Sequence, residues 1–573
     1  MLCDSEIFNK LPLGPRPELN YRTVTGKLKS IWESHPDKET LIFFDDDNER
    51  TSLKNEEIQL LAQKCSSLLR SHGVRKGDVV CNLLQSSLER EVTNFGIILA
   101  GAIVMHGDVI NDTSHHFWTP ILQANARYLI VEPVAESTGW KMLMDDIEPS
   151  GADIERSTNA EYPQIQKVFK FRLEHHMKDV NREAVKSAFD LMKAHPGVYE
   201  ERVFSHDPAA IFVAQGSQKH YKLVLRNHSQ LCQIAHRVED MFNVTPEDVV
   251  YNDWPISWLA GLPFCYISTG CSMVKSTLTE CPAQKVVRET WSLIEDEHVT
   301  IASLHPPMIQ MLSSHCDDLP EPHWTLKVLS TTGFVRQSVM DAIGTCTTSI
   351  VTCYSLIEAG VVSRLRLTEE NKTRFSEGCV GDLSDPVRTK FDTEGNGSAK
   401  ATKVGEILLQ GKLVCKEYFN DPNLTKMSFT NDGFLMTGDL GFYNEENQLF
   451  VLGRKVDAII RGGTAIFPRD IEEKVNQCPG IWKVKVVSIK DYKGIVQMCA
   501  CVIPRTDDSL TIERVKEFCR YQLGGTYDAD DNPHMPTYVF FFEEFPMHKG
   551  TVNRRMLAYM ASEIVHGNAN CEY

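Results

Sequence analysis

Two residues of opposite charge are candidates for binding chemistry. Asp439 closes the turn Thr437-Gly-Asp, and Arg454 follows fifteen residues later, just before another apolar stretch. A carboxylate accepts hydrogen bonds from hydroxyl groups, and a guanidinium donates them in a fixed planar fork. Together they can hold the two hydroxyls of a ribose. Taken singly, a Thr-Gly-Asp turn and a Gly-Arg loop are both common without any binding role.

The residues around this pair form a longer ordered pattern. Asp432-Gly433 precedes the turn, Gly441 follows it, and Phe467-Pro-Arg-Asp-Ile-Glu472 comes after the arginine. In order and spacing the pattern resembles the ribose-binding and hinge segment of the adenylate-forming superfamily, which includes acyl-CoA synthetases, coumarate–CoA ligases and firefly luciferases. The resemblance implies that Asp439 binds the ribose hydroxyls, and that Arg454 contacts the ribose and marks a hinge.

The reaction of this superfamily joins a carboxylic acid to a thiol in two steps. The carboxylate first attacks the α-phosphate of ATP bound with Mg²⁺, which gives an acyl-adenylate and pyrophosphate. The C-terminal domain then rotates, and a thiol, usually that of coenzyme A, takes the acyl group. The resemblance therefore implies ATP or AMP, Mg²⁺ and coenzyme A as ligands, and a fatty or aryl acid as substrate.

Tyr354 and Glu358 correspond to the first and last residues of the family motif Tyr-Gly-x-Thr-Glu. The resemblance implies that the tyrosine ring stacks on adenine, and that the carboxylate helps to hold Mg²⁺, which prefers oxygen ligands. Ser355 replaces the family glycine, and Ile357 replaces its phosphate-facing threonine. Gly333 corresponds to a strand end that flanks adenine. A strand that runs into an ordinary helix is the alternative interpretation of the Tyr354 segment.

Residues 213–222 match the position of the family's phosphate-binding loop. Such a loop works because glycines let backbone N–H groups close around phosphates, and hydroxyls add donors. Gly216, Ser217 and the terminal Lys222 match the family pattern, whereas Lys219 stands where a second glycine belongs. A lysine in a left-handed conformation is strained by about 1 kcal/mol. We expect a turn that is less suited to ATP than the family loop.

The segment Pro546-Met-His-Lys-Gly-Thr551 corresponds to the family motif Pro-Lys-Thr-x-x-Gly-Lys. In the family, the lysine after glycine bridges the acid and the α-phosphate during adenylation. Thr551 occupies that position and has no charge. Loss of a preorganised donor typically lowers the rate roughly 10²–10³-fold. Lys549, two residues earlier, is the candidate substitute.

The predicted hinge segment also lacks polar and charged residues that the family usually has. The family usually has a polar residue two positions after the arginine and a lysine six positions after it. Here these positions are Val456 and Ile460, and Arg461 is the candidate substitute for the second.

Trp258 and Gly261 lie in a segment that corresponds to the acyl pocket of the family. Many acyl-CoA synthetases have a histidine at the position of Trp258. An aromatic wall with a glycine suits an apolar acyl chain, as in the luciferase-like insect synthetases. A core aromatic residue in a loop explains Trp258 equally well.

The segments that must position these residues alternate between predicted helices and predicted strands. Residues 55–72 carry apolar side chains at helical spacing and predict a helix, whereas 76–84 predicts a turn followed by a buried strand. The longest apolar run, 95–105, is too short to cross a bilayer and is interpreted as a buried helix. Strands that alternate with helices predict βαβ units and largely parallel sheets.

The resemblance implies an α/β multidomain fold. Residues 1–453 would form a large AMP-binding (adenylation) domain of βαβ subdomains plus a small β-barrel. Residues 454–573 would form a small mobile α+β domain, with the hinge near 454–457. A chain of 573 residues is too long for one compact core, which agrees with two or more domains.

Composition narrows the class of protein further. The net charge of −17 argues against nucleic-acid and anionic-membrane partners, because both need a basic surface. The 17 cysteines include no C-x-x-C pair, which favours buried, reduced thiols of a cytosolic protein. No signal peptide or C-terminal Ser-Lys-Leu is recognised, so we expect a cytoplasmic protein without a transmembrane segment. A peroxisomal location follows from the family resemblance alone, and protein partners stay unknown.

Three functions stay open at this point. The first is a working acyl-CoA synthetase, an acid–thiol ligase with impaired or altered adenylation, and the retained ribose and adenine residues support it. The second is a catalytically inactive relative that binds a nucleotide, an acyl ligand or a protein partner. Five departures from the family motifs, all on the ATP chemistry, support the second: Lys219, Ile357, Val456, Ile460 and Thr551. The third, luciferase-like oxidation of an adenylate, has no specific feature in its favour.

Overall fold

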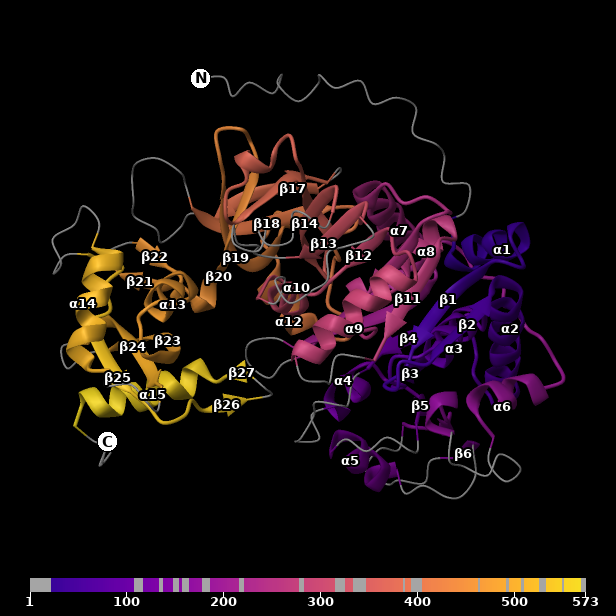
Figure 1. The fold of residues 1–573 in the computed structure, drawn as a ribbon. Coiled ribbons are helices and arrows are strands. Elements are labelled where there is room, and N and C mark those ends of the chain that lie inside the picture. Colours follow the sequence, from indigo (N-terminus) through magenta and orange to yellow (C-terminus); the bar gives the residue numbers. More distant parts are fainter. Residues whose placement is uncertain are drawn as a thin grey trace, which may run out of the picture.

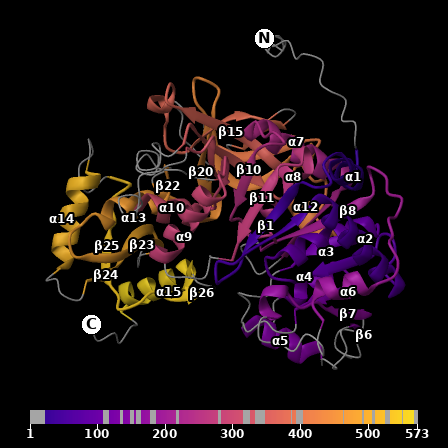
Figure 2. The same cartoon turned by 45° about the vertical axis from the view of Figure 1, so that its right-hand side comes forward.

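The chain is described here by a computed structural model. The residues that it describes are 22–107, 117–132, 138–147, 154–156, 164–177, 186–215, 221–277, 283–314, 325–332, 347–384, 387–392, 404–461, 464–490, 494–505, 510–524, 532–548 and 551–567. Figures 1 and 2 show two large sheets in the N-terminal part and a smaller group of strands and helices, β21 to α15, on one side of them.

The first sheet has seven strands and a parallel centre. Its strands are β3 (Val79–Asn82), β4 (Ile103–His106), β5 (Tyr128–Val131), β6 (Ile154–Arg156), β7 (Lys167–Lys170), β8 (Pro208–Gln215) and β9 (Tyr221–Asn227). The order is β6-β7-β5-β3-β4-β8-β9, and only the outermost pairs, β6 with β7 and β8 with β9, are antiparallel. The carboxyl ends of β3, β4, β5 and β8 therefore share one edge.

The second sheet has thirteen strands in the order β17-β18-β19-β20-β16-β15-β14-β13-β12-β10-β11-β1-β2. These strands are β1 (Glu39–Phe44), β2 (Arg50–Lys54), β10 (Val249–Asn252), β11 (Ser272–Ser276), β12 (Ile301–Ser303), β13 (Val328–Thr332), β14 (Ser349–Leu356), β15 (Gly360–Thr368), β16 (Cys379–Leu383), β17 (Val387–Asp392), β18 (Gly405–Gly411), β19 (Leu435–Tyr443) and β20 (Leu449–Arg454). The run from β14 to β1 is parallel, and the remaining pairs are antiparallel.

The antiparallel strands β16–β20 stand where the small barrel was expected. Their order is open, and no pair among the described strands joins β17 back to the other end. They continue the large sheet rather than standing apart from it.

Helices cover both sheets and fill the space between them. They are α1 (Val24–Ser34), α2 (Asn55–Ser71), α3 (Leu88–Leu99), α4 (Trp118–Gln123), α5 (Thr138–Ile147), α6 (Ala188–Ala194), α7 (His228–Phe242), α8 (Phe264–Thr269), α9 (Ala283–Asp296), α10 (Pro306–Ser314) and α12 (Pro422–Ser428). All of α3 is buried. Its Phe95 shares one apolar core with Phe43 of β1 and Val80 of β3, so this core joins the two sheets.

The C-terminal part is a small α+β unit with its own core. It contains β21 (Ile459–Arg461), β22 (Thr464–Ile466), α13 (Pro468–Asn476), β23 (Ile481–Lys490), β24 (Val496–Pro504), α14 (Ile512–Leu523), β25 (Tyr538–Phe541), β26 (Met547–His548), β27 (Thr551–Val552) and α15 (Arg554–Val565). Val475 of α13 and Val515 of α14 pack with Val486 on one face of the sheet, and Leu557 of α15 packs with Val487 on the other.

Several predicted elements are confirmed, and two are wrong. The predicted helix 55–72 is α2, and the strand predicted within 76–84 is β3. The run 95–105 is not one helix, because α3 ends at Leu99 and β4 begins at Ile103. Gly101 lies between them with φ +72°, a left-handed conformation that ends a helix readily.

The second wrong expectation concerns the segment after Tyr354. The alternative interpretation had a strand entering a helix there. Instead β14 turns at residues 357–359 and returns as the antiparallel β15. Glu358 therefore lies in a tight β-turn, whose position is set by both strands.

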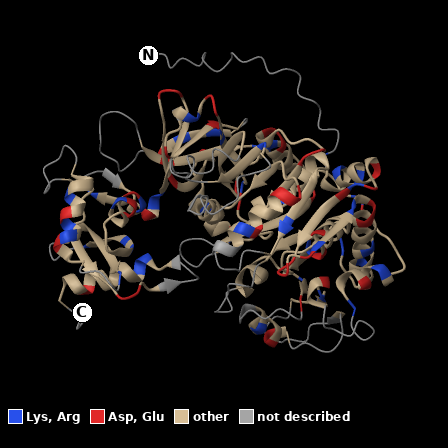
Figure 3. Cartoon of the chain, in the orientation of Figure 1, with Lys and Arg blue, Asp and Glu red and all other residues tan. Residues whose placement is uncertain are grey.

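Charged residues of both signs are interspersed over the described chain (Figure 3). Within the described residues, no helix combines the length and the apolar character needed to cross a bilayer.

Candidate active site

Asp439 and Arg454 face each other on neighbouring antiparallel strands. They are directly opposite in the register of β19 and β20, and Arg454 Nε lies 3.1 Å from Asp439 Oδ1. The Arg454 side chain is about half exposed, whereas that of Asp439 is almost fully buried. Arg454 Nη1 also donates to the carbonyl oxygen of Thr437 at 3.2 Å. A single β-hairpin thus brings together the carboxylate and the guanidinium that the sequence indicated as partners.

The predicted Thr437-Gly-Asp turn is not a turn in the structure: the segment lies within strand β19, where the pairing with β18 shifts register, and it is held from β18. Thr437 Oγ1 donates to the carbonyl oxygen of Ile407 at 2.7 Å and accepts from the Asp439 amide at 3.0 Å. Gly438 has φ +75°, where a side chain would be strained, and its amide donates to Glu406 Oε1 at 3.0 Å. These bonds orient the Asp439 carboxylate before any ligand arrives.

Tyr354 joins this pair through its hydroxyl group. It lies on β14 and donates a hydrogen bond to Asp439 Oδ2 at 2.5 Å. Burial raises the pKa of Tyr354, so the phenol stays protonated and serves as the donor. Burial also raises the pKa of Asp439, against the opposing effect of Arg454. Tyr354, Asp439 and Arg454 all line a cavity of about 450 Å³.

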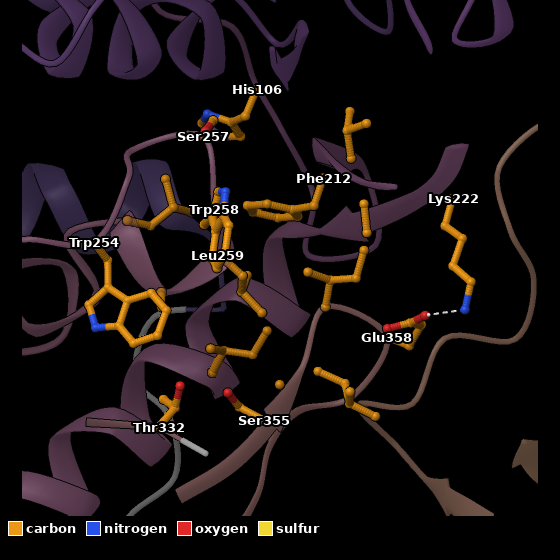
Figure 4. A pocket seen from close by; sticks show the side chains of 18 of the residues that line it. His106, Phe212, Lys222, Trp254, Ser257, Trp258, Leu259, Thr332, Ser355 and Glu358 are labelled. Atoms are coloured by element: carbon orange, nitrogen blue, oxygen red, sulfur yellow. Dashed lines mark hydrogen bonds and ion pairs between the residues drawn. The ribbon is translucent and has the colours of Figure 1, made fainter. Parts of the chain in front are cut away.

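Glu358 is held by two side chains from other elements. Lys222 Nζ of β9 lies 3.3 Å from Glu358 Oε1, and Tyr418 Oη donates to the same oxygen at 2.7 Å. The ammonium group of Lys222 also lies 5.2 Å from the centre of the Tyr418 ring. Figure 4 shows the Lys222–Glu358 contact at one side of a second, larger cavity of about 1310 Å³. The residues predicted to sit near phosphate are therefore brought together.

The Glu358 carboxylate suits one coordination position of Mg²⁺. Both of its contacts fall on Oε1, which leaves Oε2 without a partner among the described residues. The described residues contain no cluster of three or more His, Cys, Asp or Glu side chains that could enclose a metal. Mg²⁺ is commonly bound by one or two carboxylates together with substrate phosphates and water, and Glu358 fits that arrangement.

Arg226 supports this turn and was not recognised from the sequence. It is buried on β9, donates through Nη1 to the carbonyl oxygen of Leu413 at 2.5 Å, and bonds the carbonyl oxygen of Ile357 through Nη2. Burial lowers its pKa to about 10. Tyr418 was missed too, because no motif surrounds it. For Arg226 the sequence offered one signal: a charged side chain within a stretch, 221–227, that is otherwise largely apolar in its middle.

A cavity of about 1310 Å³ is bounded by residues of both sheets. Apolar side chains of α7 line one part of it, among them Ile234, Val238, Met241 and Phe242. Trp258, predicted to form part of an acyl pocket, lines this cavity, although its side chain is largely exposed. Gly261 does not line it: a Cβ there would lie 2.0 Å from the carbonyl oxygen of Pro255, so the glycine serves the close packing of the loop.

The other predicted residues lie partly outside the described chain. Gly216, Ser217, Gly333 and Lys549 are not among the described residues. For Thr551 the structure describes the backbone alone, which pairs with His548 in the short ladder of β26 and β27.

In the segment predicted to be the hinge, Val456 and Ile460 are exposed by 72% and 47%. Arg461, the candidate substitute for the hinge lysine, donates instead to the carbonyl oxygen of Met535 at 2.7 Å and is thereby held within the C-terminal part.

Comparison with known proteins identifies the family. Residues 28–419 match the model of the AMP-binding enzyme family, which is more than half of the chain. The chain therefore belongs to the AMP-binding enzymes, the adenylate-forming superfamily that the motifs predicted. Within it, the relatives are acyl- and aryl-CoA ligases.

Two relatives illustrate how low the sequence identity to known ligases is. A 2-succinylbenzoate–CoA ligase of Geobacillus sp. (strain WCH70) is 23% identical over 93% of this chain and 96% of its own. A putative acyl-CoA synthetase, YngI of Bacillus subtilis (strain 168), is also 23% identical, over 92% of this chain and 95% of its own.

Solved structures share the fold at still lower identity. The ATP-bound MatB of Rhodopseudomonas palustris has a TM-score of 0.73 and 19% identity, and the match covers 95% of this chain and 99% of MatB. The anthranilate CoA ligase AuaEII, in complex with anthranoyl-AMP, has a TM-score of 0.73 and 16% identity, covering 95% of this chain and 98% of its own.

Proposed function

We propose that this protein is an ATP-dependent ligase that joins an apolar carboxylic acid, fatty or aryl, to coenzyme A through an acyl-adenylate, with a slowed adenylation step. The observation that carries this proposal is that one cavity is lined both by polar candidate residues and by apolar side chains. Lys222, Glu358 and Arg454 line it together with the apolar side chains of α7. A nucleotide and an apolar acid could therefore meet in one space.

The chain's own residues divide the work of binding. Asp439 and Arg454 would hold the ribose hydroxyls, and the hydrogen bond from Tyr354 keeps the Asp439 carboxylate in place. Lys222 and Glu358 would lie near the phosphates. Mg²⁺, held through Glu358, would neutralise charge on the phosphate oxygens. The apolar lining would take the hydrocarbon part of the acid and exclude water from it.

The slowed step follows from Thr551. Adenylation builds negative charge at the α-phosphate, and a neutral residue at this position cannot stabilise that charge. Transfer of the acyl group to the thiol does not depend on this position. We therefore expect the thiol-transfer half-reaction to be better preserved than adenylation.

Pyrophosphate release tests the proposal. The full chain is incubated with ATP, Mg²⁺, coenzyme A and a panel of fatty and aryl acids, and Asp439→Asn serves as the control. Release that depends on the acid and falls in the control supports the proposal.

A second candidate is a nucleotide-binding protein without turnover, favoured by the apolar hinge residues Val456 and Ile460. It predicts that ATP with Mg²⁺ raises the thermal stability, because a ligand that binds only the native state stabilises it. It also predicts no pyrophosphate with any acid and no gain from Thr551→Lys.

A further inference from the structure

His106 is a buried histidine on the cavity wall, and the described part of the chain offers its ring no hydrogen-bond partner. It is only 2% exposed, and neither Nδ1 nor Nε2 has a partner among the described residues. Its ring stacks on Phe212, with the ring centres 5.2 Å apart and the planes at 19°. Both residues line the cavity of about 1310 Å³. The stacking fixes the ring but leaves its two nitrogens unsatisfied.

The position of His106 in the fold is one that ligands commonly use. It is the last residue of β4 and lies opposite Asn82, the last residue of β3, at the carboxyl edge of a parallel sheet. In open α/β sheets, ligands bind outside the carboxyl ends of the strands. Gly107 follows directly, where a Cβ would lie 2.3 Å from Leu83, so the chain is drawn tightly against β3 at this point.

Neighbouring charged groups have partners, whereas none of the described residues pairs with His106. Lys275 Nζ lies 3.0 Å from Glu91 Oε1 and donates to the carbonyl oxygen of Gly261 at 2.6 Å. Arg90 donates to the carbonyl oxygen of Gly107 at 3.1 Å. Burial, together with the positive charges of Arg90 and Lys275, lowers the pKa of His106 to about 3. The imidazole is therefore neutral near pH 7 and offers one donor and one acceptor.

His106 is separate from the residues proposed to handle the nucleotide. In Figure 4 Phe212 is drawn between His106 and the Lys222–Glu358 pair, and Trp258 lies beside Phe212 on the side away from that pair. A ligand group that meets His106 would therefore lie across Phe212 from the groups proposed to bind the phosphates. The aromatic rings of Phe212 and Trp258 suit a hydrocarbon or aryl body.

From this juxtaposition we infer that His106 selects the acid substrate, and that the preferred acid carries an uncharged hydrogen-bonding group, a hydroxyl or a carbonyl, remote from its carboxylate. The inference rests on the proposed function and narrows its substrate class. An acid with a plain hydrocarbon end would leave both nitrogens of His106 buried and unpaired. A buried polar group without a partner is unfavourable, so the plain acid should bind more weakly.

Matched pairs of acids test the inference by binding, without turnover. Isothermal calorimetry on the full chain, with Mg²⁺ and α,β-methylene-ATP, whose α–β linkage cannot be cleaved, compares each n-alkanoic acid with its ω-hydroxy analogue at several chain lengths, and cinnamic acid with its para-hydroxy analogue. We expect at least one pair to show a preference of about tenfold for the hydroxylated acid, the size of one net hydrogen bond.

Two variants assign that preference to His106. His106→Phe keeps an aromatic ring against Phe212 but removes both nitrogens, and should reduce the preference to about onefold while plain acids still bind. His106→Gln keeps a donor and an acceptor, and should retain part of the preference. His106→Phe should also be at least as stable as the natural chain, because it removes unpaired buried polar atoms.

Other outcomes separate this inference from the proposed function. Equal binding of both members of every pair would overturn the inference and leave the ligase proposal standing, since a cavity water would then satisfy His106. Retention of the preference in His106→Phe would overturn it as well. If no acid of either kind binds, the proposed acid pocket fails, and the inference fails with it.

Discussion

The hydroxyl of Tyr354 donates a hydrogen bond of 2.5 Å to the carboxylate of Asp439, 85 residues further along the chain. This bond links β14 to β19 and joins the residue predicted to stack on adenine to the residue predicted to bind ribose. Asp439 also contacts Arg454 at 3.1 Å. The three side chains form one polar unit on the wall of the smaller cavity.

Tyr354→Phe should weaken nucleotide binding and lower stability together. The variant keeps the ring but leaves the buried Asp439 carboxylate with one partner fewer. A buried acceptor that loses its donor destabilises a protein by about 1–3 kcal/mol. Chemical denaturation would measure the stability, and the thermal shift with ATP and Mg²⁺ would measure binding. A variant with unchanged stability and an unchanged shift would show that the bond has no role in either.

Thr551→Lys should raise acid-dependent pyrophosphate release by about 10²-fold, if the proposed adenylation is slow for want of a positive charge. Thr551→Met, which is long but uncharged, is the matched control and should give no gain. The two variants should transfer a pre-formed acyl-adenylate to coenzyme A at the rate of the natural chain. A gain in Thr551→Met equal to that in Thr551→Lys would show that charge is not the missing property.

Glu358→Gln should separate the metal from the nucleotide. The amide oxygen can still accept a hydrogen bond from Tyr418, so the turn should hold its shape. The neutral group is a weaker ligand for Mg²⁺. The thermal shift caused by ATP in excess EDTA should therefore be similar in the variant and the natural chain, whereas the extra shift on adding Mg²⁺ should be smaller in the variant. An equal Mg²⁺-dependent shift in both proteins would exclude Glu358 as a metal ligand.

The C-terminal part should lose stability in acid through Glu472 of α13. Glu472 Oε1 lies 2.6 Å from Arg554 Nη1, and Oε2 lies 3.0 Å from Nη2. Burial opposes the charged form, but Arg554, the Val486 amide and Lys485 outweigh it and lower the pKa of Glu472 below 4.5. A depressed carboxyl pKa stabilises the fold above the unfolded value, and that stability is lost as the pH falls from about 4.5 through the folded value.

Hydrogen exchange of the backbone amides in β23 and β24 measures the stability of the C-terminal part as a function of pH. In the natural chain, protection should decline below about pH 4.5. In Glu472→Gln the protection should already be lower at pH 7, by about 1.5–3 kcal/mol, because Arg554 loses its charged hydrogen-bond partner. The same variant should show a smaller further decline in acid. A decline in acid that is as steep in Glu472→Gln as in the natural chain would place the titrating group elsewhere.

The sequence by itself determined the family, the helices and strands with regular apolar spacing, and the pairing of Asp439 with Arg454. Asp439 and Arg454 lie fifteen residues apart, and one β-hairpin brings them together, so a short stretch of chain was enough to predict them as partners. The helix α2 and the strand β3 were readable because their apolar spacing is regular. The end of α3 at Leu99 was missed because the apolar run continues without a break into β4, and the turn depends on the left-handed conformation of Gly101.

The tertiary structure alone decided which distant side chains meet. Tyr418 bonds Glu358, which is 60 residues away in the sequence. Arg226 bonds the carbonyl oxygen of Ile357, in the same turn as Glu358, from 131 residues away. No local pattern encodes such contacts, because they arise where separate strands pack. The same holds for His106, which follows a run interpreted from the sequence as a buried helix and in the structure ends strand β4. Its place on the wall of the larger cavity, stacked on Phe212, becomes visible only when β4 and β8 are folded together.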